Sequence, residues 1–288
     1  WKGDRDEQVR LRFVTTAGQP AIDDLAIRAG QGAWRTVASH LAPVFRVVSG
    51  RRRLTNQQLD PLAGLGIPIT KALVEKEQWE AFWDAPLHVP GGESAHNNTT
   101  PPQRGVLDQP GLPRSPAELT RADARFHVTG CAVKTTGARL EVSFPGVTLG
   151  VFEGRLQYSI YRGTNLVRQE IVATTDAPSV AYKYDAGLDG LPPAPSARVA
   201  WQDVDKAAQD HRFGAEADQA PVTVRSADRI LVAELPGGSI AALPPPHNVF
   251  WARETNYNLG YNWYRQTGAT SFGFGTRQAE NEDPPEVE

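Results

Sequence analysis

The stretch Arg155-Leu156-Gln157-Tyr158-Ser159-Ile160-Tyr161-Arg162 alternates polar with apolar side chains. This is the period of a strand with one buried face. Arg139-Leu140-Glu141-Val142-Ser143-Phe144 repeats the pattern and places Leu140, Val142 and Phe144 on one side. Further short segments of this kind, separated by Gly, Asp or Pro, continue to residue 279. The series predicts a mainly β fold, an antiparallel β-sandwich.

Working outward, residues 9–14, 21–27 and 44–48 predict strands of an N-terminal β segment over residues 1–54. The pattern then changes. Thr55 and Gln58 have the spacing of a capping box, and Thr70 precedes apolar residues at helical spacing. We therefore expect a helical insertion around residues 55–84.

The sequence predicts five regions along the chain. The regions are a β segment (1–54), the helical insertion (55–90), a loop or linker (91–120), the main β-sandwich (121–279) and an acidic tail (280–288).

Composition excludes several classes of protein. The 288 residues carry 30 basic and 33 acidic side chains, and this near-neutral balance argues against a nucleic-acid-binding protein. One Cys cannot form an internal disulfide or a Cys-rich metal site. No apolar run approaches the roughly 18 residues of a membrane span. Because the sequence has no Met, we expect a processed start or a piece of something longer.

The motifs of common catalytic and cofactor sites are absent from the sequence. It has no phosphate-binding loop, dinucleotide fingerprint, nucleophile elbow or zinc-binding His-Glu-x-x-His, and its six His are scattered. The sequence therefore predicts neither a metal nor a cofactor. Cys131 lies within a predicted strand and is expected to be a buried, inert thiol.

Residues 244–265 hold the densest group of candidate site residues. Aromatic rings beside hydrogen-bonding groups suit the apolar face and hydroxyl rim of a sugar. Core aromatics with surface polar groups are the more frequent outcome for such a segment. The candidate ligand-binding residues here are Trp251, Arg253, Tyr257, Tyr261 and Trp263, and the candidate acid and base are His247 and Glu254.

A second cluster surrounds a predicted hairpin turn at residues 162–165. Arg162 and Asn165 lie in the turn, and Arg168 follows on the next strand with Glu170 on the same face. Lys183 and Asp185 close the strand after it. These residues predict either a polar ligand site or cross-strand ion pairs, of which ion pairs are the more frequent outcome.

Four stretches carry a resemblance to a known group of proteins: residues 80–87, 154–170, 178–185 and 244–265. They resemble the N-terminal β-rich region of large secreted bacterial metallohydrolases of the carbaryl-hydrolase type. That region is similar in style to galactose-mutarotase-like sandwiches, so the resemblance implies a supersandwich as one form of the fold. It also implies a secreted or periplasmic location, and a catalytic domain farther along the chain or on a partner.

We expect a secreted β-sandwich module that binds carbohydrate or supports the catalytic domain of a larger hydrolase. One alternative is a self-contained carbohydrate-active enzyme, an epimerase, lyase or glycosidase, that uses His247 and Glu254 for proton transfer. In that case Arg162, Arg168 or Arg253 would bind a sugar acid. The other alternative is a processed subunit of an extracellular assembly.

Overall fold

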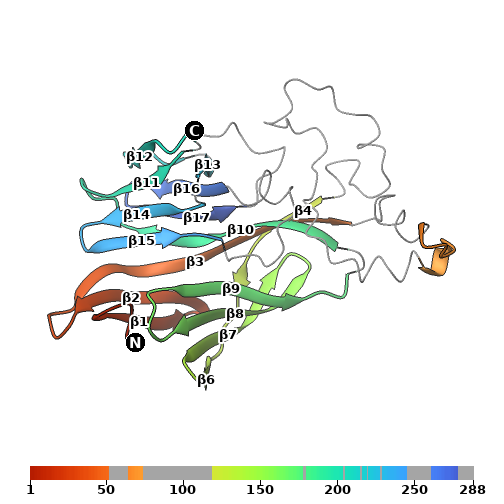
Figure 1. Cartoon of the computed structure of the whole chain (residues 1–288), viewed down its shortest axis with the longest axis horizontal. Helices are drawn as coiled ribbons and strands as arrows, with labels where there is room; N and C mark the ends of the chain where they lie inside the picture. The colour runs from red at the N-terminus through yellow and green to blue at the C-terminus, as the bar shows by residue number, and fades with distance from the viewer. Residues whose placement is uncertain are drawn as a thin grey trace.

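Antiparallel strands in three sheets make up most of the structure, a computed structural model (Figure 1). It describes residues 1–51, 64–73, 119–177, 180–203, 205–214, 216–218, 220–227, 229–244 and 261–277. The strands are β1 (Glu7–Thr16), β2 (Gln19–Ala29), β3 (Arg35–Arg51), β4 (Leu119–Asp123), β5 (Arg125–Phe126), β6 (Ala132–Thr136), β7 (Arg139–Leu149), β8 (Phe152–Tyr161), β9 (Val167–Thr174), β10 (Val180–Leu191), β11 (Arg198–Gln202), β12 (Ala208–Arg212), β13 (Val222–Arg225), β14 (Leu231–Leu235), β15 (Gly238–Ala242), β16 (Tyr261–Gly268) and β17 (Ser271–Arg277).

The largest sheet has the order β1-β2-β3-β10-β17-β16-β13, with β4 also paired to β3. Strand β3 joins its two halves. Its first part pairs with β2 from Arg35 to Leu41, and its second part pairs with β10 from Ala42 to Arg51. The partner changes between Leu41 and Ala42, and His40 just before this point has a left-handed φ of 56°. The N-terminal segment and the strands after residue 180 therefore share one sheet.

The two smaller sheets pack against different halves of the large one. Phe13 of β1 lies 4.7 Å from Tyr158 of β8 between ring centroids, so the sheet β5-β7-β8-β9 packs on the β1 side. Phe213 stacks on Phe272 of β17 at 3.8 Å, beside the sheet β12-β11-β14-β15. Buried side chains from all three sheets form one apolar cluster. Burying each large apolar side chain contributes about 1.5–3 kcal/mol.

The predicted antiparallel, mainly β fold is confirmed. The alternation that predicted it corresponds to burial of Leu156, Tyr158 and Ile160 on β8. The opposite face of β8 is also partly covered, because Gln157 donates hydrogen bonds to Glu141 and Glu170 of the two flanking strands. Here the burial departs from the simple alternation.

The predicted helical insertion is not supported. Within residues 64–73 only Gly64 and Lys71–Leu73 are helical, and the rest of the prediction lies outside the described residues. Gly66 has a φ of 73° and interrupts the helical pattern. Pro68 disfavours a helical conformation at the residue before it. Thr70 does accept the amide of Leu73 as a cap, but it caps only a short turn.

Cys131 was expected to be a buried thiol in a strand, and that prediction is wrong. The residue is exposed and precedes β6. No helix among the residues that the structure describes is long and apolar enough to cross a membrane.

Gly187 of β10 provides a test of how closely the large sheet packs. A Cβ at this position would lie 2.8 Å from Cζ2 of Trp263 and would also clash with the carbonyl oxygen of Phe274. We expect Gly187→Ala to lower the free energy of unfolding by about 1–3 kcal/mol in urea titrations. Gly214, which has nothing within 4 Å of such a Cβ, is the matched control. Equal stability of the two alanine variants would contradict this packing.

His211 predicts how stability depends on pH. Its ring stacks on Tyr264 at 4.6 Å, and burial lowers its pKa, opposed by Asp218 and Asp210. Because the folded pKa lies below the unfolded value, the unfolded chain takes up the proton first as pH falls. The contribution of His211 to stability is therefore complete above its ordinary pKa of 6.5 and is lost below it.

Urea unfolding at about pH 8 and about pH 5.5 measures this effect. His211→Phe keeps a ring in the stack, so its free energy of unfolding should fall less between the two pH values than that of the unsubstituted chain. The same fall in both proteins would rule out the His211 contribution.

Candidate functional site

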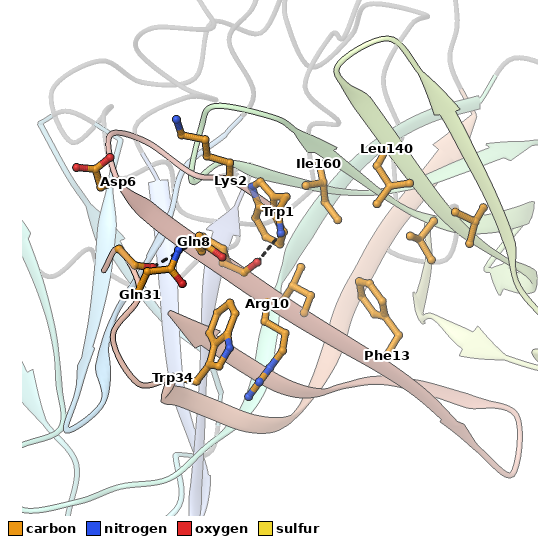
Figure 2. Close-up of a pocket in the computed structure, with 15 residues that line it drawn as sticks. Trp1, Lys2, Asp6, Gln8, Arg10, Phe13, Gln31, Trp34, Leu140 and Ile160 are labelled. Atoms are coloured by element: carbon orange, nitrogen blue, oxygen red, sulfur yellow. Dashed lines mark hydrogen bonds between the residues drawn. The ribbon is translucent and has the colours of Figure 1, made fainter. Parts of the chain in front are cut away.

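A groove of about 870 Å³ lies along β1, the terminal strand of the large sheet. One edge of β1 pairs with β2, and the other faces the sheet that contains β6, β7 and β8. Figure 2 shows Leu140 and Ile160 on one side of the β1 ribbon, and Trp34 and Arg10 on the other. The groove is lined by Trp1, Lys2, Asp6, Gln8, Val9, Arg10, Leu11, Phe13, Gly30, Gln31, Trp34, Val133, Leu140, Val142 and Ile160.

Trp1 lies within the groove and is fixed there by main-chain and side-chain hydrogen bonds. Its main-chain nitrogen donates to the carbonyl of Val9 at 2.7 Å, and the amide of Val9 donates back to Trp1 at 3.0 Å. Lys2 faces Gln8 in an antiparallel bridge. The indole Nε1 of Trp1 donates to the carbonyl of Thr164 in the β8–β9 turn at 2.8 Å. Residues 1–2 thus form an isolated antiparallel bridge on the outer edge of β1.

Beyond Phe13, the last residue of β1 that lines the groove, the turn between β1 and β2 also contacts the neighbouring sheet region. Ala17 and Gly18 both have positive φ, as a tight two-residue hairpin turn requires. The carbonyl of Gly18 accepts a hydrogen bond from the amide of Val128 at 3.0 Å. The two sheets are therefore joined by hydrogen bonds both at Trp1 and at the β1–β2 turn.

Trp34 covers the polar face of β1 and β2. The guanidinium carbons of Arg10 and Arg28 lie 4.7 and 4.6 Å from its ring centroid, within cation–π range. Arg10 also donates to Asp24 at 2.8 Å. Burial raises the pKa of Asp24, but the hydrogen bonds from Arg10 and Thr36 outweigh it and hold that pKa below its usual value. Cation–π contacts with Trp34 and the ion pair between Arg10 and Asp24 therefore fix the side chains at this rim of the groove.

The opposite wall is apolar. Leu140, Val142 and Ile160 come from β7 and β8, and Leu11 and Phe13 face them from β1. Val133 of β6 is 63% exposed, an unusual exposure for a large apolar side chain beside a core. A ligand in this groove would meet apolar surface on one side, and indole and guanidinium groups on the other.

Most of the candidate sugar-binding segment lies outside the described residues, including His247, Trp251, Arg253, Glu254 and Tyr257. Their roles stay predictions. Tyr261 begins β16 opposite Arg225. Trp263 is 1% exposed, and the guanidinium of Arg46 lies 5.7 Å from its ring.

Lys183 and Asp185 project from one face of β10 and are both buried. Asp185 accepts two hydrogen bonds from Arg277, at 2.9 and 2.8 Å, and Arg277 also donates to Thr223. This bidentate pair joins β10 to β17. Of the two predicted alternatives for this cluster, a polar ligand site or cross-strand ion pairs, the contacts of Asp185 match the ion pair.

The turn residues take part in holding the N-terminal segment. The predicted hairpin turn is present, with Gly163 at a φ of 88°. Asn165 accepts from the amide of Asp4 at 3.0 Å and donates to Glu7. Arg168 pairs with Glu170 at 2.6 Å, and the main-chain amide of Arg162 donates to Ala138. Among the described residues, no hydrogen bond or ion pair links this group to Lys183, Asp185 or Trp263.

Sequence reasoning missed the residues that line the groove. The alternation of Val9, Leu11 and Phe13 with Gln8, Arg10 and Arg12 indicated a two-faced strand. It did not indicate that this strand lies beside side chains of β6, β7 and β8. Within the part of the chain that the structure describes, no three His, Cys, Asp or Glu side chains gather closely enough to hold a metal ion.

Asp185 and Arg277 allow a direct test of the buried ion pair. Asp185→Asn leaves the guanidinium of Arg277 without its carboxylate in a largely buried position. We expect a loss of unfolding free energy on the order of 3 kcal/mol in urea titrations. Glu234→Gln breaks the more exposed pair with Arg198 and should cost less than about 1 kcal/mol. Similar losses for the two variants would contradict a structural role for the Asp185 pair.

Comparisons with family models, with curated proteins and with solved structures found no match for this chain. The resemblance to the β-rich region of secreted metallohydrolases therefore stays a prediction.

Proposed function

We propose that this chain is a binding module whose ligand lies in the groove along β1. The observation that carries the proposal is the groove itself, in which the edge of β1 faces an apolar wall that includes the exposed Val133. Concave, mostly apolar sites with a few placed polar groups are the usual form of ligand sites. This proposal retains the expected supporting role, because a module of this kind can hold a catalytic domain or another subunit.

The charged side chains around the groove favour binding over proton transfer. Arg10 pairs with Asp24, and Arg12 pairs with Asp23 at 2.6 Å. These pairs fix the rim, and hydrogen bonding by Arg10 lowers the pKa of Asp24, which favours the charged carboxylate. A general acid or base instead needs a pKa close to the working pH.

Carbohydrate is the second candidate ligand. Trp1 and Trp34 line the groove together with the amides of Gln8 and Gln31, and sugars stack on indole rings and bond to amides. However, Trp34 already has two guanidinium groups within 4.7 Å of its ring centroid. The apolar wall is also larger than sugar stacking requires. These features favour a polypeptide ligand.

Selection of a displayed peptide library on the immobilised chain tests the proposal. Val133→Glu places a charge on the apolar wall, and Leu166→Glu is its matched control, since Leu166 is 61% exposed and does not line the groove. We expect selected peptides to lose at least about tenfold in affinity for Val133→Glu and to keep their affinity for Leu166→Glu.

A titration with a panel of soluble oligosaccharides runs in parallel. Sugar binding that depends on Val133 or Trp34 would assign the groove to carbohydrate. If neither peptides nor sugars bind in a way that depends on the groove, the proposed function is wrong.

A further inference from the structure

We draw no further inference here: the strongest candidate, the pocket of about 430 Å³ over β11, β12 and β14, carries no proposal because Arg198 in its lining already pairs with Asp210 and Glu234, and nothing in the structure shows what covers the apolar side chains that line it.

Discussion

The pairing of β3 with both β2 and β10 is the interaction on which the rest of the structure depends. Without it, residues 1–34 would have no link to the strands after residue 180 in the large sheet. The five-stranded sheet packs beside β1, and the four-stranded sheet beside β17. Buried side chains from both regions belong to the same apolar cluster. The change of partner falls between Leu41, the last residue paired with β2, and Ala42, the first paired with β10.

Local patterning predicted much of the fold but not its connections. The alternation in residues 139–144 and 155–162 correctly indicated two strands, because side-chain period depends only on neighbouring residues, but it did not indicate that β8 is buried on both faces from Leu156 to Ile160. Pairing of β3 with β10 depends on residues far apart in sequence, and no local pattern encodes it. The helical insertion is not supported: within residues 64–73 only Gly64 and Lys71–Leu73 are helical, with Gly66 and Pro68 between them, and residues 52–63 and 74–84 lie outside the described part of the chain.

The candidate site shows the same difference between what local patterns predict and what long-range packing decides. Trp263 was expected to face a ligand, yet it is buried against Gly187, whose missing side chain leaves room for the indole. A sequence pattern that indicates such close packing is Phe272-Gly273-Phe274-Gly275, where glycines alternate with large rings on β17. Relating this pattern to Trp263 required knowing that β17 lies between β10 and β16. The groove along β1 was not predicted, because a groove between two sheets is a property of the assembled sheets and not of any one segment.

The same long-range pairing has a kinetic consequence. The hairpin of β1 and β2 can form from local contacts within microseconds, and the first part of β3 pairs with the nearby β2. The second part of β3 must wait for β10, since Val48 faces Lys183 far along the chain. Closing so long a loop delays the large sheet, and folds dominated by distant strand pairs fold slowly. During synthesis the first three strands leave the ribosome well before their partner. Their apolar faces then stay open to solvent, and at this stage the chain is most exposed to aggregation and most in need of a chaperone.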